Sequence, residues 1–295
     1  MSGGAEVTTE LLRGWRLPRP GANSDKNARG RVLVLAAGAQ VAGATLLAAL
    51  GALRTGAGKL QIGAPRSLAP MLALAVPEAR VIPAAETAEA ELAPEAAEDL
   101  ARAFARAEAA VIGPGMLDED AAGELALRLL GTDGPAVVVD AAAMQRVAEN
   151  PRSARRRAGE LVLTPHAGEM AALAGVERAE VEANPCEIAR RTAAQLQAVV
   201  ALKGAETLIV SPDGKAWRHV GGVVGLATSG SGDVLAGIIA GLIARGASPA
   251  QAAVWGVFVH GQAGARLTQR IGRIGFLARE LLDEIAPILE ELEAG

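Results

Sequence analysis

The sequence predicts one α/β domain built around a mostly parallel sheet. Short apolar runs alternate with longer stretches rich in Ala, Leu, Glu and Arg, such as Glu95–Arg106 and Glu119–Leu130. The apolar runs are Val32–Leu35, Leu60–Ile62, Ala110–Ile112, Ala136–Val139, Leu161–Leu163 and Val199–Leu202. Strands that are covered by helices on both faces are apolar throughout, so this alternation favours a parallel sheet between two helical layers. Hydrophobic residues make up 51% of the 295, enough for one large core.

The two ends of the chain depart from this central pattern. Residues 1–30 are polar and rich in Gly, Pro and Arg, and we expect a short helix near Thr9–Gly14. We assign residues 1–22 to an N-terminal lead-in segment and residues 23–295 to the single domain. Further along, Pro212-Asp213-Gly214 lies between two strand-like runs and predicts a β-hairpin. The chain then becomes helical, over Ser231–Ala244, Pro249–Gln269 and Ala278–Glu293.

Composition argues against several classes of function. The net charge of −4 gives no basic footprint for nucleic acid, and the one dense basic run, Arg152 with Arg155–Arg157, is expected to be a solvated surface. Cys186 is the only cysteine, which excludes an internal disulfide and a cysteine metal cluster. No apolar run reaches the ~18 residues of a membrane helix, so we expect a cytoplasmic protein.

The topology of such a sheet predicts where ligands bind. In open parallel sheets the ligand lies beyond the carboxyl ends of the strands. The Gly-rich or polar segments that directly follow strands are Ala37–Ala44, Gly113–Met116, Asp140–Ala143, Thr164–Glu169 and Lys203–Thr207. We expect all five segments at one edge of the sheet.

The small-residue loop Ala227–Asp233 runs directly into the apolar helix that starts at Ser231. The first amides of a helix have no intrahelical partner and carry partial positive charge, so this loop suits a phosphate. Gly230 and Gly232 allow the backbone to approach the anion closely. Asp233 is interpreted either as a helix cap or as a general base beside a transferred phosphoryl group. The apolar helix that follows must be buried, which favours the general base.

A second segment, Leu163–Glu169, is a Pro-containing loop that follows a strand and begins a helix. Two interpretations are open: His166 is a ligand contact or a surface histidine, and Glu169 is a magnesium partner or a capping residue. A carboxylate in the first helical turn is favoured by the helix dipole, and hard cations prefer oxygen ligands.

Weaker indications come from single residues. Lys203 ends a buried strand, and Asp140 follows another strand as a metal partner or a cap. The turn Ile112–Met116 on its own indicates only a turn. His260 lies in an apolar helix, where a hydrogen-bonded core histidine is the favoured interpretation. The residues Trp15, Trp217 and Trp255 are scattered and predict no stacking platform.

Taken in order, these segments resemble the ADP/ATP-dependent NAD(P)H-hydrate dehydratase family of the ribokinase-like superfamily. The resemblance rests on the motifs from Asp25 to Leu33, the Gly-rich run 43–58, Ile-Gly-Pro-Gly at 112–115, Leu-Thr-Pro-His-x-Gly-Glu at 163–169, Leu-Lys-Gly-x-x-Thr at 202–207 and Leu-Ala-Thr-x-Gly-x-Gly-Asp at 226–233. It covers about residues 23–290 and implies a ribokinase-like three-layer α/β/α sandwich.

The resemblance also implies a reaction and a site. Family members use ADP or ATP with Mg²⁺ to phosphorylate the hydroxyl of the (6S) hydrate of NADH or NADPH, and loss of phosphate restores the reduced cofactor. Asp233 would be the catalytic base and would contact the hydrate together with Ala44, Gly115 and His166. The nucleotide would contact Lys203, Gly204, Ala205, Glu206, Thr207, Gly230, Ser231 and Gly232. Glu169 would hold Mg²⁺ through water.

Two positions depart from the family pattern. Val41 stands where a Tyr is common, and Ala142 stands where the family often has a second Asp. The sequence also lacks the N-terminal epimerase domain that is fused in some members, so we expect a separate epimerase as a functional partner, and a homotetramer. The alternatives are a ribokinase-like kinase similar to hydroxyethylthiazole kinase and a non-catalytic nucleotide sensor.

Overall fold

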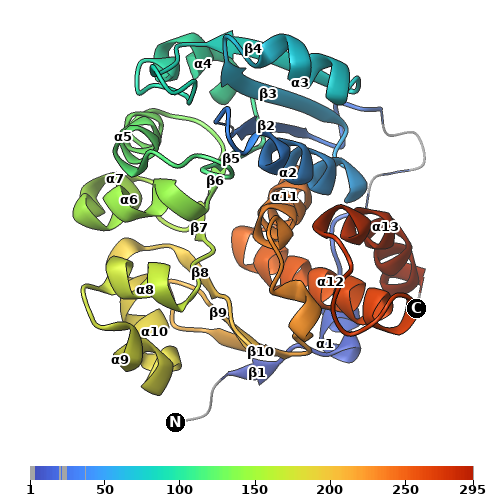
Figure 1. Cartoon of the computed structure of the whole chain (residues 1–295). Helices are drawn as coiled ribbons and strands as arrows, with labels where there is room; N and C mark the ends of the chain where they lie inside the picture. Colours follow the sequence, from blue (N-terminus) through green and yellow to red (C-terminus); the bar gives the residue numbers. More distant parts are fainter. Residues whose placement is uncertain (1–3, 20, 22–24, 37, 295) are drawn as a thin grey trace.

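The computed structural model describes residues 4–19, 21, 25–36 and 38–294 of the chain. One ten-stranded sheet runs through the molecule between two layers of helices (Figure 1). Its strand order is β1-β10-β9-β8-β7-β6-β5-β2-β3-β4. Strands β2 to β8 are parallel to one another, whereas β9 is antiparallel to both β8 and β10. The predicted three-layer sandwich with a mostly parallel sheet is thus confirmed.

The strands have the following bounds. They are β1 (Ala5–Glu6), β2 (Arg31–Leu35), β3 (Lys59–Pro65), β4 (Ala79–Ala84), β5 (Ala109–Ile112), β6 (Ala136–Val139), β7 (Leu161–Leu163), β8 (Val199–Leu202), β9 (Glu206–Val210) and β10 (Ala216–Val220). The six predicted central strands and the hairpin β9–β10 are all present. Strands β1 and β4 were not predicted, and both lie at sheet edges.

The helices have the following bounds. They are α1 (Thr9–Gly14), α2 (Ala42–Arg54), α3 (Ala69–Ala75), α4 (Ala96–Phe104), α5 (Glu119–Leu130), α6 (Gln145–Glu149), α7 (Pro151–Arg156), α8 (Ala167–Ala174), α9 (Arg178–Ala183), α10 (Pro185–Leu196), α11 (Ser231–Ala244), α12 (Pro249–Arg270) and α13 (Ala278–Ala294), with the 3₁₀ turns η1 (Ala141–Met144) and η2 (Val224–Leu226). None of the helices within the described ranges is long and apolar enough to cross a membrane.

Successive side chains along each central strand point alternately into two separate hydrophobic cores. Val32 and Val34 of β2 face the core that contains α2, α11 and α12, whereas Leu33 and Leu35 face the core that contains α4, α5 and α8. Among the helices of the described residues α11 is the most enclosed, because every residue from Val234 to Ala244 is buried. Its burial, expected from the absence of a polar face, anchors the Gly-rich loop at its start.

The N-terminal segment belongs to the same sheet. β1 pairs in parallel with β10, and the Trp15 ring stacks on Trp217 with centroids 5.4 Å apart. Trp255 donates from Nε1 to the Trp15 carbonyl at 2.9 Å. The three tryptophans are scattered in the sequence but contact one another in the fold, and these contacts hold the N-terminal segment against the sheet. The domain boundary near residue 22 stays a prediction, and residues 22–24 lie outside the described part.

One prediction about the surface is wrong. Arg157 is only 6% exposed, and its guanidinium lies over the Phe104 ring at 5.7 Å and donates to the Gly134 carbonyl at 2.9 Å. The long side chain covers apolar surface while its charged end finds polar partners. The other three arginines of that basic run, at 152, 155 and 156, are exposed as expected.

Candidate active site

The carboxyl ends of the parallel strands form one edge, and the predicted ligand segments meet there. The direction of strand order reverses between β2 and β5, which is where ligands bind in open α/β sheets. At that point a Cβ added to Gly115 would lie 2.8 Å from the Ala44 Cβ and from the Val41 carbonyl oxygen. Gly115 has φ +72°, so this close approach needs a glycine. Ala37, in the first segment, lies outside the described residues.

A charged cluster occupies the middle of this edge. Lys203 Nζ lies 3.1 Å from Asp140 Oδ1 and 3.9 Å from Glu169 Oε2, and the Thr164 hydroxyl donates to Asp140 Oδ1 at 2.7 Å. Asp140 is 3% exposed. Burial lowers the pKa of Lys203, but the carboxylates of Asp140, Glu169 and Asp233 outweigh burial and the net pKa shift is upward. Lys203 is therefore a permanent cation at the centre of the edge.

The Gly-rich loop lies directly against this cluster. A Cβ added to Gly232 would lie 3.4 Å from Lys203 Nζ and 3.8 Å from Asp140 Oδ2. Gly230 is the N-cap residue of α11 and has φ +89°. A Cβ added to it would lie 2.4 Å from Leu47 Cδ1. A larger residue at position 230 would therefore be both strained and obstructed. The free amides at the start of α11 and the Lys203 ammonium face a common space that suits an anion.

Asp233 is a carboxylate with an unusual environment. It lies in the first turn of α11, and burial, followed by repulsion from Asp140, raises its pKa to about 7, against the attraction of Lys203. The helix cap is Gly230, and within the described residues the Asp233 side chain makes no hydrogen bond. The interpretation of Asp233 as a cap is therefore wrong. A carboxyl that changes protonation near neutral pH is suited to general base catalysis.

His166 and Glu169 form a capping box at the start of α8. Nδ1 of His166 accepts from the amides of Gly168 and Glu169 at 3.0 and 3.2 Å, and the His166 amide donates to Glu169 Oε2 at 2.7 Å. The capping interpretation of Glu169 is thus confirmed. Because Nδ1 accepts, the neutral His166 ring carries its proton on Nε2. That ring lines a cavity of about 410 Å³ together with Glu169, Ala142 and Met116.

His260 supports the Gly-rich loop from the neighbouring helix α12. Its Nε2 lies 2.9 Å from the Ser231 hydroxyl and 3.0 Å from the Ser231 carbonyl oxygen. Burial lowers the pKa of His260 to about 4, so the ring is neutral. The interpretation as a hydrogen-bonded core histidine is confirmed, and its partner is a residue of the predicted phosphate loop, which the sequence did not indicate.

The predicted nucleotide segment lies on both faces of the sheet edge. Lys203, Gly204, Ala205 and Glu206 line a cavity of about 520 Å³ whose other walls come from α9 and α10. Thr207 does not line that cavity, and because side chains alternate along β9 it points to the opposite face. It shares that face with its partner His219, whose ring packs edge-on to Phe258 of α12. Thr207 is thus on the side of the sheet that α11 and α12 cover.

The donor set at this edge fits a hydrated magnesium ion and not a closed protein cage. Among the described residues no three His, Cys, Asp or Glu side chains converge as metal ligands. Asp140 Oδ1 and Glu169 Oε2 already accept hydrogen bonds, which leaves one carboxylate oxygen on each without a hydrogen bond, and that of Glu169, Oε1, lies 3.5 Å from His166 Nε2. Mg²⁺ typically keeps several waters and uses one or two carboxylates with substrate phosphates. Ala141, beside Asp140, has φ +51°, a strained conformation that no sequence pattern revealed.

The fold and this edge define a ribokinase-like α/β protein with a Gly-rich loop at the start of a buried helix and a half-buried carboxylate, that of Asp233. A solved ribokinase-like superfamily protein from Enterococcus faecalis shares the fold, with a TM-score of 0.83 at 22% identity over 99% of this chain and 97% of that one. The family model described as NAD(P)H-hydrate dehydratase matches residues 32–287. The chain belongs to the NAD(P)H-hydrate dehydratase family, as the sequence resemblance indicated.

Two relatives illustrate the match. The ADP-dependent (S)-NAD(P)H-hydrate dehydratase of Xanthomonas campestris is 47% identical over 98% of this chain and 97% of its own length. The crystal structure of the ADP/ATP-dependent NAD(P)H-hydrate dehydratase from Bacillus subtilis, co-crystallised with ATP/Mg²⁺, gives a TM-score of 0.82 at 31% identity. That match covers 99% of this chain and 100% of that one. Both relatives are matched along nearly their whole length.

Proposed function

We propose that this protein is a hydro-lyase that uses ADP or ATP to dehydrate (6S)-NAD(P)H hydrate to NAD(P)H through a phosphorylated intermediate. The observation that supports it most directly is Asp233, a carboxyl with a pKa raised to about 7 beside the amides of the Gly-rich loop. Asp233 accepts the proton of the hydrate hydroxyl as its oxygen attacks the terminal phosphorus. The nucleotide loses that phosphoryl group. Phosphate then leaves the ring while the neighbouring ring carbon releases a proton to water, and the electron pair of that C–H bond forms the double bond.

The remaining side chains bind and orient. We assign the terminal phosphate to Lys203 and to Gly230, Ser231 and Gly232 of the Gly-rich loop, because a Cβ on Gly232 would lie 3.4 Å from Lys203 Nζ. The amide of Ser231 donates to the Thr228 carbonyl at 3.3 Å, so the phosphate is assigned to the other amides of the loop. Gly204, Ala205, Glu206 and Thr207 contact the rest of the nucleotide. Ala44, Gly115 and His166 contact the hydrate. When bound, Mg²⁺ neutralises phosphate charge, and Glu169, with an Oε1 that makes no hydrogen bond, holds the ion through water.

The proposed reaction also implies a cellular compartment, a partner enzyme and an oligomeric state. The enzyme would act in the cytoplasm, because its reduced dinucleotide substrates are cytoplasmic cofactors. A separate epimerase would supply the S epimer from the R epimer. A homotetramer is the expected assembly, which light scattering on the purified chain measures directly.

The test is the reaction itself. Purified hydrate with Mg²⁺ and either ADP or ATP should regain the absorbance of reduced nicotinamide and release free phosphate in equal amounts. A small-molecule kinase would accumulate a phosphorylated product, and a sensor would turn over no nucleotide. Either of these results would contradict the proposal.

His166 should determine affinity for the hydrate. The ring has two functions, since Nδ1 caps α8 while the ring also lines the 410 Å³ cavity, with Nε2 3.5 Å from Glu169 Oε1. His166→Asn keeps a capping oxygen and removes Nε2, so the melting temperature should stay near that of the wild type while the hydrate KM rises about tenfold. His166→Ala should lose both the cap and the contact. An unchanged hydrate KM in the Asn variant would show that His166 only caps α8 and does not contact the hydrate.

Thr207 should affect the nucleotide more than the hydrate. It lies on the sheet face covered by α11 and α12, the helix layer that also carries the Gly-rich loop. Thr207→Ala should weaken nucleotide binding about fivefold to tenfold in calorimetry, the equivalent of one hydrogen bond. Thr207→Ser, which retains the hydroxyl, is the matched control. A change confined to the hydrate KM would show that this assignment is wrong.

A further inference from the structure

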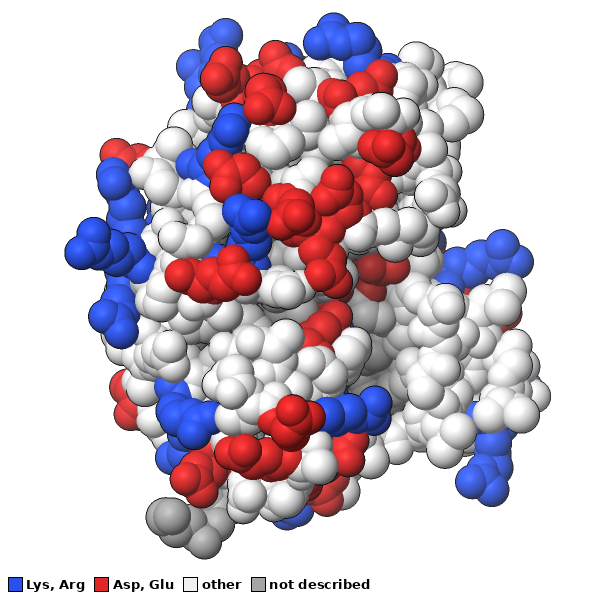
Figure 2. Space-filling model, turned by 60° about the vertical axis from the view of Figure 1, so that its left-hand side comes forward, with Lys and Arg blue, Asp and Glu red and all other residues white. Residues whose placement is uncertain are grey.

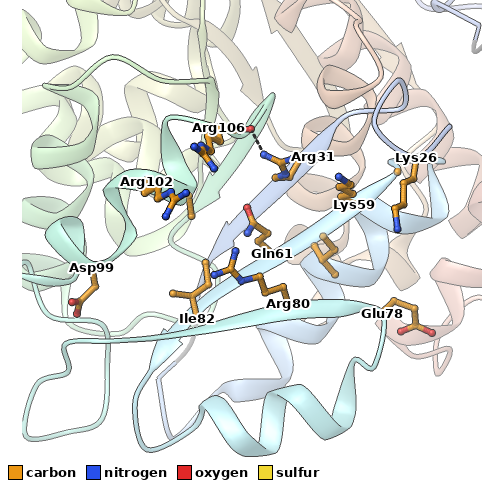
Figure 3. Close-up of a pocket in the computed structure, with 13 residues that line it drawn as sticks. Lys26, Arg31, Lys59, Gln61, Glu78, Arg80, Ile82, Asp99, Arg102 and Arg106 are labelled. Atoms are coloured by element: carbon orange, nitrogen blue, oxygen red, sulfur yellow. Dashed lines mark hydrogen bonds between the residues drawn. The ribbon is translucent and has the colours of Figure 1, made fainter. Parts of the chain in front are cut away.

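A third cavity lies at the opposite end of the sheet from the active site. It has a volume of about 580 Å³ and lies where β2, β3 and β4 begin, beside the carboxyl-terminal half of α4 (Figure 3). Since parallel strands run away from this end toward the active site, the length of the sheet separates the two places. Its size is within the range of small-molecule sites.

The cavity collects positive charge. Six cationic side chains line it, Lys26, Arg31, Lys59, Arg80, Arg102 and Arg106, against the two carboxylates of Glu78 and Asp99. Within the described ranges Lys26, Arg80, Arg102 and Arg106 make no salt bridge with a carboxylate. Arg31 is held at the rim because Nη1 donates to the Arg106 carbonyl at 2.7 Å (Figure 3). Like charges gathered in a concave site repel one another unless an anion lies between them.

A buried amide lies among these cations. Gln61 is only 8% exposed, and its Oε1 is buried without a hydrogen-bond partner among the described residues. Figure 3 shows the Gln61 side chain in the middle of the cavity, between Arg31, Arg80 and Arg102. An unpaired buried acceptor is costly, and each one in a native structure calls for an explanation. A donor brought by a ligand would satisfy it.

Protection of the sheet edge would be a simpler explanation for the positive charge, but it does not account for Gln61. Edge strands such as β4 often carry charged residues that prevent sheets from joining edge to edge. That function needs charges on the outer strand only. It requires neither Gln61, in the next strand inward, nor Arg102 and Arg106 near the end of a covering helix. On the face of the molecule in Figure 2, by contrast, acidic side chains form a band and basic ones lie mainly around it, without a comparable basic concentration.

We propose that this cavity binds a sugar phosphate. Guanidinium groups pair with phosphate oxygens in a bidentate geometry, and Arg80 and Arg102 approach the cavity from opposite walls, β4 and α4. A sugar hydroxyl supplies the donor that Gln61 Oε1 lacks, and the apolar surface of Ile82 and Ala103 accommodates the carbon skeleton. The site is separate from the nucleotide and hydrate sites assigned above.

Calorimetry on the full chain tests the proposal with ribose 5-phosphate and inorganic phosphate as probes. One equivalent of ribose 5-phosphate should bind with a Kd below about 1 mM, and inorganic phosphate should bind about tenfold more weakly. The double variant Arg80→Gln/Arg102→Gln should weaken ribose 5-phosphate at least tenfold. Arg152→Gln removes another exposed arginine, one that does not line the cavity, and should change nothing. Lys203→Met, at the active site, should also leave this binding unchanged.

A second variant tests the role of the buried amide. Gln61→Met keeps the length of the side chain and removes the unpaired oxygen, so the ligand-free protein should melt at a higher temperature. The same variant should bind the two probes equally well. The proposal is overturned if ribose 5-phosphate does not bind by about 1 mM, if the double arginine variant binds it as the wild type does, or if Lys203→Met abolishes binding. A preference for ribose 5-phosphate that survives in Gln61→Met would overturn the assignment of the hydroxyl contact.

Discussion

Asp233→Asn is expected to lower turnover by about 10²- to 10⁴-fold, the range typical of losing a general base. The hydrate hydroxyl becomes an effective nucleophile only as its proton is accepted, and an amide cannot accept it. Asp233 makes no hydrogen bond within the described residues and does not cap α11, so the loss cannot come from a broken cap. Nucleotide affinity should change little, because the amides of the loop and Lys203 remain.

The raised pKa of Asp233 adds a pH dependence. In the wild type kcat/KM should rise with pH as Asp233 ionises, with a midpoint near its pKa of about 7. A flat profile between about pH 6 and pH 8 would contradict the general-base assignment. Near-wild-type turnover in the Asn variant would contradict it as well.

Stability provides an independent measurement on the same variant. Folding raises the pKa of Asp233, so the protonated carboxyl favours the native state. This contribution to stability is fully present when the pH is below 3.8, the pKa in the unfolded chain. That contribution is lost as the pH rises through about 7, so ionised Asp233 destabilises the protein at pH 8. Asp233→Asn removes the charge and with it this destabilisation of the folded protein. Its melting temperature should therefore exceed that of the wild type at pH 8, and the difference should shrink at pH 5.

The fold was predictable where burial leaves a strong pattern. Central strands such as β6 and β8 are apolar at every position, which only a sheet covered on both faces requires. β4 escaped prediction because it is an edge strand in which Arg80 and Pro83 interrupt the apolar run. β1 has only two residues, and its pairing with β10 depends on tertiary contacts that local sequence does not reveal.

The candidate site was predictable in outline, because strand ends identify its edge whatever their order in the sheet. Its interactions were not predictable. Asp140 and Lys203 are 63 residues apart in sequence, and neither position alone indicates an ion pair. The sequence at a strand end does not show that Asp140 lies close enough to Asp233 to raise its pKa. The Gly-rich loop therefore has a second carboxylate beside it, that of Asp140.

Lys203→Met should also have a large effect, through two routes. The phosphate loses its permanent cation, for which we expect turnover at pH 7 to fall by about 10²-fold. Asp233 loses the one attraction that lowers its pKa, so the midpoint of the kcat/KM profile should move above pH 7. Lys203→Arg retains the charge and should keep the midpoint near that of the wild type. Lys215→Met, which breaks the exposed pair with Asp213, is the matched control for loss of a lysine and should alter neither quantity.

The stability of the same variant shows how the cluster is held together. Lys203→Met leaves the carboxylate of Asp140 buried without its cation, a change that typically destabilises a protein by about 3–5 kcal/mol. Adding Asp140→Asn removes that charge while an oxygen remains to accept from Thr164, so most of the stability should return. The second substitution also removes the repulsion that raises the pKa of Asp233, and the pH midpoint should move back toward 7. Turnover should nevertheless stay low, because no cation faces the phosphate. If the double variant regained wild-type turnover, the role of Lys203 would be confined to neutralising Asp140.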